Sequence, residues 1–380
     1  MKKLIYVSVI LLLCVFAVFL TSCRKSYDIT YELDGGVNSA ENPSEYQKGE
    51  TVKLGIAKKK DYAFIGWYND PELENLVTKI DSNTVGDITL YAGWIKTEYA
   101  LTFEYIKKGI HGPCYYLSEC DKRVQYVEIP KKHINCPVTG IETGAFAECD
   151  SLEEVVMENS ITFIGNGAFY GCESLKKITL GENITSIGDG AFAKCTSLKT
   201  IIIPNDVKEI GNLVFMGCTS LEEINIGELT SYISEKDFRD CSSLEAINVS
   251  VHNEKYMSMD GVLYSKDGST LIYYPQGKKD SSFVVPDSVS VIGSYAFSEN
   301  PYIENIILSD SVTSINNLAF GDCISLKSIN IPSAVTKIGI GAFYNCSALT
   351  VSCQAYTKPT DWDLEWSDDV KEVIWGYKEN

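Results

Sequence analysis

The sequence feature that most constrains the fold is a phenylalanine that returns every 23 residues. One step of 59 residues interrupts the period, and the phenylalanines are Phe146, Phe169, Phe192, Phe215, Phe238, Phe297, Phe320 and Phe343. An isoleucine five residues earlier, a cysteine three residues later and a leucine six residues later keep the same phase. Around Phe297 alone, Asn300 takes the cysteine position and Ile303 the leucine position. The chain therefore repeats one structural unit many times.

A single repeat is not stable by itself. The repeat that begins at Leu175 offers about eight apolar side chains, whose full burial contributes roughly 12–24 kcal/mol. Ordering its 23 residues costs roughly 1–2 kcal/mol per residue for the backbone alone. Stacked repeats add burial between neighbours and hydrogen bonds between strands. A period of 20 to 29 residues built on leucine and isoleucine is typical of a leucine-rich-repeat solenoid, so we expect a mainly β solenoid whose coils are about 23 residues long.

The repeat motif also resembles a known family. The pattern is L-x-x-I-x-I-P-x-x-V-x-x-I-G-x-x-A-F-x-x-C-x-S, and residues 198–220 and 326–348 match it closely. It resembles the BspA-like leucine-rich-repeat family of bacterial surface proteins, from about Leu101 to the C-terminus. The resemblance implies a curved β solenoid, a cell-surface setting and a binding or adhesive role. It implies no shared catalytic residues.

The N-terminus has the pattern of an export signal. Lys2 and Lys3 precede an apolar run over residues 4–20, and residues 1–22 are predicted to be a signal peptide. Leu-Thr-Ser-Cys at residues 20–23 resembles the bacterial lipobox, which implies that Cys23 is acylated and that residues 23–26 form a lipidated N-terminus. An uncleaved membrane anchor is the alternative, because the apolar run is long enough. Either way, the rest of the chain lies outside the cytoplasm.

Residues 27–94 form a separate predicted domain. Strand patterns occur at residues 27–33, 51–54, 64–68 and 88–94, with an Asp-Gly-Gly turn at residues 34–36. The set ITYELDGG, FIGWYND and LYAGW resembles one internalin-type B-repeat, also called the Listeria–Bacteroides repeat. The resemblance implies a small β-grasp-like module that serves as a spacer or a partner contact. Trp67 and Trp94 are interpreted as core aromatics, with sugar stacking as the alternative.

The remaining boundaries follow from where the period begins and ends. We expect a linker at 95–100, an N-terminal cap at 101–140, leucine-rich repeats at 141–348 and a C-terminal cap at 349–380. Trp362, Trp366 and Trp375 are expected to cover the last coil. An insert at about 250–282 interrupts the repeats, and its Asp267-Gly268 predicts a β-hairpin. The insert is either a protruding recognition element or a thickened coil.

The charge of the chain excludes one class of partner. The net charge is −18, and loss of residues 1–22 leaves 31 basic and 51 acidic residues, or −20. Nucleic acid is excluded as a partner, because phosphate binding requires clustered lysine and arginine. The same charge keeps the protein off anionic lipid surfaces except through its N-terminal lipid.

The cysteines are the most conspicuous chemical groups. Seven of them keep the repeat phase, and we call them the cysteine ladder: Cys149, Cys172, Cys195, Cys218, Cys241, Cys323 and Cys346. Buried core residues are the favoured interpretation, over disulfides between coils or a metal site. The N-terminal cap holds a second group, and disulfide, free thiols and metal remain open for it: His111, Cys114, Cys120, His133 and Cys136. No motif of an enzyme is present, so neither catalysis nor a cofactor is expected.

The predicted binding surface is a row of outward-facing positions on stacked strands. In L-x-x-I-x-I, the residue between the two isoleucine positions points outward. This outward row comprises Val156, Thr179, Ile202, Asn225, Asn248, Ile307 and Asn330. Solenoids bind along such strands, so we expect a protein or glycan ligand and an adhesin-like role. The alternative function is an envelope scaffold that contacts a neighbouring protein through residues 27–94.

Overall fold

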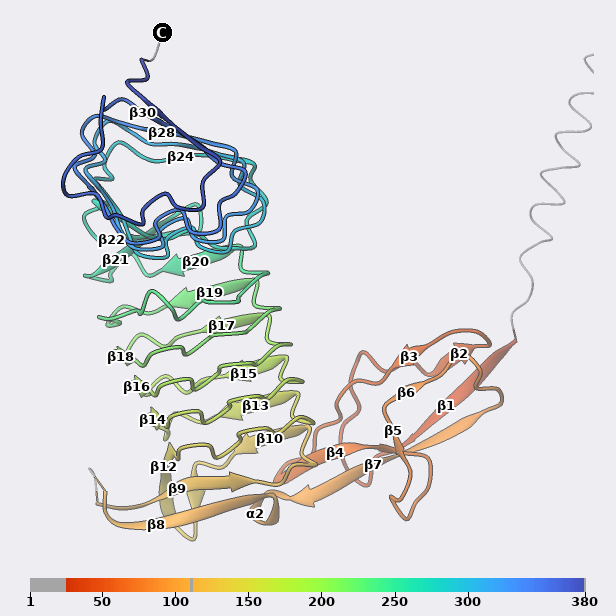
Figure 1. Ribbon diagram of the computed structural model, residues 1–380. Coiled ribbons are helices and arrows are strands. Elements are labelled where there is room, and N and C mark those ends of the chain that lie inside the picture. Colours follow the sequence, from red (N-terminus) through yellow and green to blue (C-terminus); the bar gives the residue numbers. More distant parts are fainter. Residues whose placement is uncertain (1–24, 110–111, 379–380) are drawn as a thin grey trace, which may run out of the picture. The chain divides into compact units, whose positions relative to one another are not determined.

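The computed structural model describes residues 25–109 and 112–378. These residues are almost entirely β and divide into two compact units, one ending at Ile95 and the other beginning at Lys96 (Figure 1). The predicted signal peptide, Cys23 and His111 lie outside the described residues. In the part of the chain that is described, no helix has the length and apolarity needed to cross a bilayer.

The described part of the first unit contains seven strands, four of which lie at the predicted ranges 27–33, 51–54, 64–68 and 88–94. They are β1 (Ser26–Glu32), β2 (Glu45–Gln47), β3 (Val52–Lys53), β4 (Tyr62–Tyr68), β5 (Leu76–Val77), β6 (Lys79–Ile80) and β7 (Ile88–Lys96). The main sheet runs β4-β7-β1-β2, with β1 parallel to β7 and antiparallel to β2. Strands β3 and β6 form a second, antiparallel pair. Asp34 and Gly35 have positive φ in the turn after β1, where glycine relieves the strain.

Aromatic side chains form the core of the first unit. Trp67 is buried, and its indole N–H donates to the carbonyl of Gly55 at 2.8 Å. Trp94 donates to the carbonyl of Leu33 at 3.1 Å, and Phe64 packs edge-on against both tryptophan rings. The single N–H donor of each indole is therefore hydrogen-bonded inside the domain. This supports the interpretation of both tryptophans as core aromatics over a role in sugar stacking.

The second unit begins with an N-terminal cap whose strands start two sheets. After α2 (Thr97–Ala100), the N-terminal cap contains β8 (Leu101–Gly109), β9 (Gly112–Cys120), β10 (Tyr126–Ile129), β11 (Lys132–His133) and β12 (Cys136–Ile141). β8 and β9 pair antiparallel, and β9 then pairs parallel with β12. β10 pairs parallel with β13, the first long strand of the repeats. The cap therefore supplies hydrogen-bonding partners for the first coil on both of its faces.

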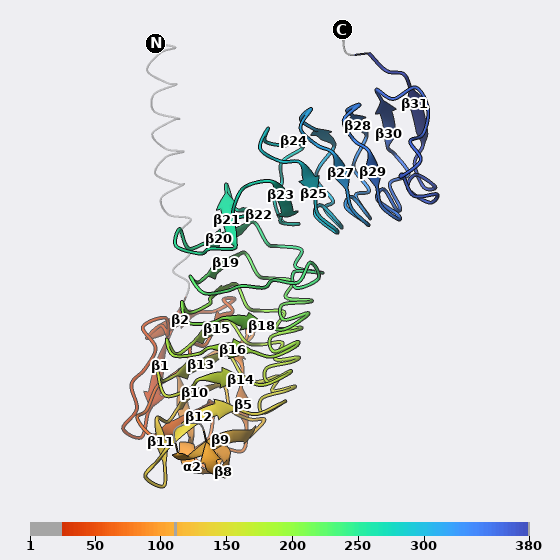
Figure 2. The same cartoon turned by 90° about the vertical axis from the view of Figure 1, so that its left-hand side faces the viewer.

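Each following coil contributes one longer strand, and the first three of these coils also contribute a two-residue strand. The longer strands are β13 (Glu154–Met157), β15 (Lys177–Thr179), β17 (Thr200–Ile202), β19 (Glu223–Ile226) and β20 (Ala246–Val249). The short strands are β14 (Phe163–Ile164), β16 (Ser186–Ile187) and β18 (Glu209–Ile210). Both kinds stack parallel to form two rows (Figure 2). The predicted fold class is confirmed, because the chain forms a β-solenoid of about 11 turns with repeats about 23 residues apart.

The insert is built into the solenoid wall. β21 (Tyr256–Met259), β22 (Val262–Ser265) and β23 (Thr270–Tyr273) pair antiparallel, so the predicted hairpin is present. β23 also pairs parallel with β25 (Val291–Ile292), which leads on to β27 (Ser314–Ile315) and β29 (Lys337–Ile338). Tyr273 packs against Phe238, and Tyr274 stacks on Phe297. These contacts favour a thickened coil over a protruding element.

The C-terminal coils repeat the arrangement and are covered by tryptophans. Their longer strands are β24 (Ser282–Val284), β26 (Asn305–Ile307), β28 (Ser328–Ile331), β30 (Thr350–Cys353) and β31 (Glu372–Trp375). Trp362 and Trp366 are buried, and Trp366 packs edge-on against Phe343, with 5.9 Å between ring centroids. Two tryptophans therefore close the apolar end of the phenylalanine stack.

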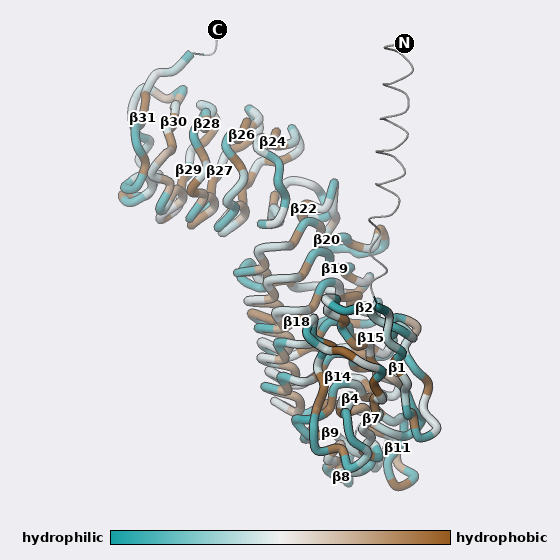
Figure 3. The backbone as a smooth tube through the Cα atoms, turned by 90° about the vertical axis from the view of Figure 1, so that its right-hand side faces the viewer, coloured by the Kyte–Doolittle hydropathy of each residue, from teal (hydrophilic) through white to brown (hydrophobic). Residues whose placement is uncertain are grey.

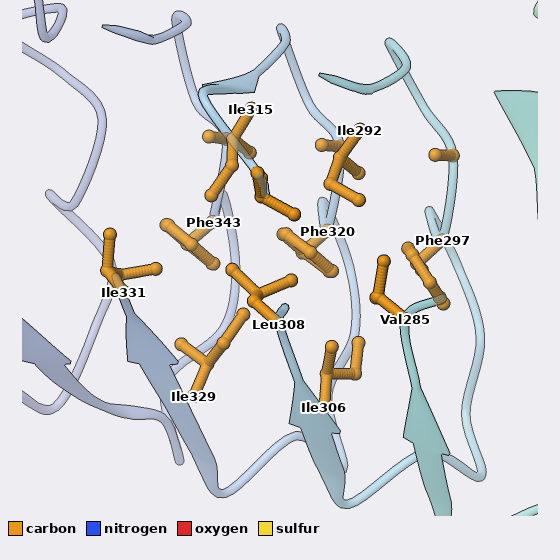
Figure 4. Close-up of a cluster of buried hydrophobic side chains, with 14 of the residues drawn as sticks. Val285, Ile292, Phe297, Ile306, Leu308, Ile315, Phe320, Ile329, Ile331 and Phe343 are labelled. Carbon is orange, nitrogen blue, oxygen red and sulfur yellow. The ribbon is translucent and has the colours of Figure 1, made fainter. Parts of the chain in front are cut away.

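The core is a stack of rings between two rows of aliphatic side chains. Phe297, Phe320 and Phe343 lie one above another at 5.1 and 5.2 Å between isoleucines of the short and the long strands (Figure 4). In the N-terminal coils the same spacing runs from 4.7 to 6.1 Å. Hydrophobic stretches recur from coil to coil along the tube (Figure 3). Each coil therefore buries its apolar positions against its two neighbours, as the energy balance of a single repeat requires.

Candidate functional site

The cysteine ladder is a structural element. From Cys172 onward, each ladder thiol donates a hydrogen bond of 3.0–3.2 Å to the carbonyl of the phenylalanine 26 residues earlier. Burial raises the pKa of the Cys218 thiol to about 12, which keeps this donor protonated. Asn300, at the cysteine position of its coil, donates instead to the carbonyls of Pro275 and Gln276. The position thus calls for a small buried donor, and the ladder is not a reactive or ligand-binding site.

The cysteines of the N-terminal cap do not gather around a metal. Cys114 and Cys120 are buried and Cys136 is half-buried, and all three are free thiols. His133 stacks on Phe103 at 4.4 Å between ring centroids, so its ring is part of an aromatic cluster. Over residues 25–109 and 112–378, no group of three or more His, Cys, Asp and Glu side chains has a geometry that suits a metal ion.

The predicted outward row lies where the repeat pattern places it, on the solvent side of the longer strands. Its neighbours lie directly opposite one another in three segments, which pair Val156 with Thr179, Ile202 with Asn225 and Asn248, and Ile307 with Asn330. The side chain of Ile202 is 68% exposed and that of Ile307 is 53% exposed. Little of either side chain is therefore buried by packing within the solenoid.

Register extends the row beyond the residues predicted from sequence. Glu128 lies opposite Val156, and Val284 lies opposite Ile307. Ser352 and Ile374 continue the row past Asn330. Val284 lies 23 residues before Ile307, so the period alone predicts that it belongs to the row. Ser352 lies 22 residues after Asn330, so a count in steps of 23 does not find it.

A polar cluster occupies the middle of the row. The side-chain amides of Asn225 and Asn248 both donate to one carboxylate oxygen of Glu223, at 3.0 and 2.8 Å. Asn248 also donates to the side-chain oxygen of Asn225 at 3.4 Å. Ile202 and both asparagines line a shallow hollow of about 270 Å³. Hydrogen bonds therefore hold these polar side chains in place beside an exposed aliphatic one, an arrangement suited to a docking surface.

An exposed aliphatic pair marks the row in the C-terminal coils. Val284 on β24 is 63% exposed and lies opposite Ile307 on β26. Ile374, at the other end of the same sheet, is 40% exposed. Ion pairs such as that between Lys327 and Glu304, at 2.7 Å, lie on the same coils. Exposed aliphatic side chains and ion pairs therefore occur together on these coils.

A second surface runs along the short strands and was not predicted. It is a groove of about 500 Å³, and on one of its sides Asn166, Asp189 and Asn212 recur at the position after Ile-Gly. Asp189 accepts a bond of 2.6 Å from the backbone N–H of Asn212, and Asn166 accepts one of 2.9 Å from Asp189. At Gly188, an added Cβ would lie 2.6 Å from the backbone nitrogen of Asn166. Close packing of adjacent coils therefore accounts for the glycines and for much of the polar lining.

One ionisable group is buried inside the repeats. Asp237 occupies the position before the phenylalanine, where most coils have alanine, and its side chain is fully buried. It accepts hydrogen bonds from the backbone N–H groups of Ser234 at 2.7 Å and Val214 at 3.4 Å. Desolvation raises the pKa of this carboxyl to about 7. Because its oxygens are turned inward, Asp237 is not part of a surface site.

Comparison with known proteins matches both parts of the chain. A family model described as the BspA type leucine rich repeat region matches residues 120–258 and 274–355 in 6 copies. A second model, the Listeria-Bacteroides repeat domain, matches residues 27–93. The chain is similar to a leucine-rich repeat protein from Eubacterium ventriosum, with 26% sequence identity and a TM-score of 0.56 over 72% of this chain and 73% of that one. Both resemblances read from the sequence are confirmed.

Further matches are weaker or cover less of the chain. A leucine rich cell surface protein from Faecalibacterium prausnitzii shares 22% identity, with a TM-score of 0.42 over 73% of this chain and 94% of that one. A relative from Evansella cellulosilytica, provisionally named as a membrane protein, is 34% identical over 87 residues. The match spans 22% of this chain and only 12% of that protein's length. Proteins with these repeats are typically non-enzymatic binding scaffolds, and they are typically exposed at the cell surface.

Proposed function

We propose that this chain, which belongs to the BspA-type leucine-rich-repeat family, is a cell-envelope lipoprotein with an adhesin-like role. It binds a protein or glycan ligand through its solenoid. Between these two ligand classes, the outward row favours protein. The observation that carries the proposal is the exposure of aliphatic side chains on that row, at Ile202 on β17 and at Val284 and Ile307, which lie opposite one another on β24 and β26.

The energetics of the row support a protein partner. Burial of exposed apolar area is favourable by about 25 cal/mol per Å², so a partner that covers these aliphatic side chains gains affinity from each of them. The clustered Glu223, Asn225 and Asn248 add oriented polar groups beside Ile202. A fixed polar group loses little conformational entropy on binding, which adds specificity at low cost. Both features therefore favour a specific docking surface over a plain solvated sheet.

The predicted lipid anchor supports the envelope location. Acylation of Cys23 would attach the chain to a membrane, since multiple acyl chains hold stably where one chain is marginal. Only residues 24–26 separate that cysteine from the first domain, so the domain at 27–94 would stay close to the bilayer. The surface exposure that is typical of the family agrees with this location.

The binding test compares three isoleucines with similar exposure. Beads coated with the protein are applied to host epithelial cells and to neighbouring bacteria, and bound beads are counted. We expect Ile202→Asp and Ile307→Asp to reduce binding at least tenfold. Ile340→Asp is the matched control, because Ile340 is also 53% exposed but lies after the short strand β29, outside the outward row. Equal binding by all three variants would contradict the proposal.

The location test is protease shaving of intact cells, followed by immunoblotting. Loss of the solenoid from unbroken cells is the expected result for a surface lipoprotein. Protection until the envelope is opened would contradict surface adhesion and favour the scaffold function.

The scaffold alternative rests on the first unit. Val37, Leu76 and Val85 are 70%, 51% and 56% exposed there, which is unusual for apolar residues in a domain of this size. In this function the repeat domain would hold a neighbouring envelope protein. Crosslinking in intact cells should then yield a fixed set of envelope proteins, and Leu76→Asp should abolish their recovery without affecting bead adhesion.

A further inference from the structure

The sheet that contains the short strands has outward positions of its own. On β14, β16 and β18 the first residue is partly or fully exposed and the second is buried, so the first residues face solvent. Register extends this set back to β9 and β12 (Figure 2). With the residue one repeat later, this short-strand row comprises Tyr116, Gly140, Phe163, Ser186, Glu209 and Tyr232. Three of its six positions therefore carry aromatic side chains.

A glycine lets two of these rings meet. Gly140 lies between Tyr116 and Phe163 in the register, and a Cβ added to it would collide with the ring of Phe163. The Phe163 ring therefore lies over β12, edge-on to the ring of Tyr116 with 4.8 Å between the centroids. Both side chains are half-buried. They line a hollow of about 250 Å³ at the junction of the N-terminal cap and the first coils.

Threonine side chains line the same hollow. The hydroxyl of Thr162 donates to the carbonyl of Thr139 at 2.9 Å, and that of Thr185 donates to the carbonyl of Thr162 at 3.0 Å. A hydroxyl that donates its hydrogen still has lone pairs that accept hydrogen bonds. The hollow thus combines aromatic rings with acceptors that the stacking of coils holds in place.

The hollow adjoins the groove of about 500 Å³ along the short strands, because Phe163 lines both. Tyr232, whose side chain is 53% exposed, lines the groove as well. Asp189 and Glu209 supply its carboxylates, and neither is in an ion pair with any residue of 25–109 or 112–378. Close packing of coils explains the glycines of this groove, whereas its aromatic rings and carboxylates face solvent.

We propose that the short-strand row binds a neutral, extended glycan that crosses the strands between Tyr116 and Tyr232. A pyranose ring has an apolar C–H face that packs on an aromatic ring, and its hydroxyls donate to carboxylate and hydroxyl oxygens. Concave surfaces with apolar walls and a few fixed polar groups are typical of ligand sites. This site lies apart from the outward row, so the inference goes beyond the protein binding of the proposed function.

The spacing of the aromatic positions fits an extended glycan. Neighbouring strands lie about 4.8 Å apart, so the backbone of Phe163 is roughly 10 Å from that of Tyr116 along the stack. By the same count, Tyr232 is roughly 14 Å beyond Phe163, and the whole row is roughly 24 Å long. A pyranose unit of an extended glycan is nearly as long as one strand spacing. A chain of about six sugar units therefore spans the row.

The charge of the groove selects a neutral glycan. The carboxylates of Asp189 and Glu209 accept hydrogen bonds from sugar hydroxyls but repel carboxylate, sulfate and phosphate groups. The net charge of −18 adds a repulsive field over the whole chain. Glycans that carry uronic acids or sulfates are therefore excluded from this site.

The test is affinity electrophoresis of the whole chain in native gels that each contain one soluble polysaccharide. Starch, mixed-linkage β-glucan, arabinoxylan and galactomannan are the neutral probes, and polygalacturonate is the acidic one. The protein is kept in a polyoxyethylene detergent, which carries no sugar. We expect at least one neutral polymer to retard the protein and polygalacturonate to leave its migration unchanged. Retardation by none of the neutral polymers, or by polygalacturonate, would overturn the proposal.

Matched variants place the site. Phe163→Ala and Tyr232→Ala should each weaken retardation about tenfold or more, as removal of a central aromatic contact does. Tyr344→Ala is the control, because Tyr344 is also 53% exposed but follows Phe343 outside the short-strand row. Equal retardation of all three variants would contradict the location. If circular dichroism shows that Phe163→Ala is misfolded, Tyr232→Ala decides, since its exposed side chain carries little packing.

Two further measurements separate this site from the outward row and define its length. Ile202→Asp, which should reduce bead binding, should leave retardation unchanged, so either proposal can fail without the other. Calorimetric titration with oligosaccharides of the retarding polymer should show an affinity that rises up to about six sugar units and then stays constant. An affinity that is already constant from two units onward would overturn the extended site.

Discussion

Asp237 should make the solenoid less stable at neutral pH than in mild acid. The pKa of its carboxyl is about 7 in the folded chain against an ordinary value of 3.8, because burial penalises the ionised form more than the backbone amides of Ser234 and Val214 favour it. Between these two pH values the folded chain binds more protons than the unfolded chain. Stability is therefore full below pH ~3.8 and falls as the pH rises to about 7.

The size of the effect follows from the shift. A difference of about three pKa units corresponds to about 4 kcal/mol lost above pH 7, at 1.36 kcal/mol per unit. About 3 kcal/mol of this change falls between pH 5 and pH 8. Other groups near the carboxyl contribute smaller effects, and Asp189 is the charged one that raises its pKa further.

Asp237→Asn isolates the effect, since the amide has nearly the same shape but does not ionise. Urea unfolding of both proteins is followed by circular dichroism at pH 5 and pH 8, and the difference between the two proteins is taken at each pH. We expect the variant to gain about 3 kcal/mol relative to the unaltered protein on going from pH 5 to pH 8. An unchanged difference would refute the argument that this carboxyl is buried without a counter-charge.

Four further outcomes are expected. Phe192→Ala should destabilise the solenoid by about 3–5 kcal/mol in calorimetry, because it opens a cavity in the middle of the ring stack. Cys195→Ala should cost about 1–3 kcal/mol in urea unfolding, since the carbonyl of Phe169 loses its donor, whereas Cys195→Ser keeps one and should cost less. Ile202→Asp should leave the melting temperature within about 2 °C of the unaltered protein, as its exposed side chain carries no packing, so any lost binding is a surface effect. Gly188→Ala should cost about 1–3 kcal/mol in urea unfolding, because the added Cβ would lie 2.6 Å from the backbone nitrogen of Asn166 in the neighbouring coil.

Periodicity made the fold accessible from sequence. A fixed spacing of phenylalanine, isoleucine, cysteine and leucine permits one solution, in which identical coils stack and each position forms its own row. The same spacing located the outward row, because alternation along a strand decides which side chains face solvent. The acidity of the chain led to the prediction that it has no nucleic-acid partner, by the same kind of elementary reasoning.

Departures from the period were beyond sequence reasoning. Hydrogen-bond register decides that Ser352 follows Asn330 by 22 residues and that β23 pairs with β25 in the row of short strands. The alternation of residues in an isolated strand does not determine this register. The groove beside the short strands arises from backbone packing at Gly188, where the cause is the neighbouring coil.

The sequence by itself determined the repeat, the direction in which each side chain points and the chemistry available at each row. Only the tertiary structure decided which partners meet at the ends, where no neighbouring repeat completes the pattern. Ser352 shows the difference: the period predicts an outward residue 23 residues after Asn330, but the hydrogen-bond register places Ser352 opposite it, 22 residues on. The repeat period can be read from the sequence alone, whereas the contacts at an interruption depend on three-dimensional packing between segments that share no period.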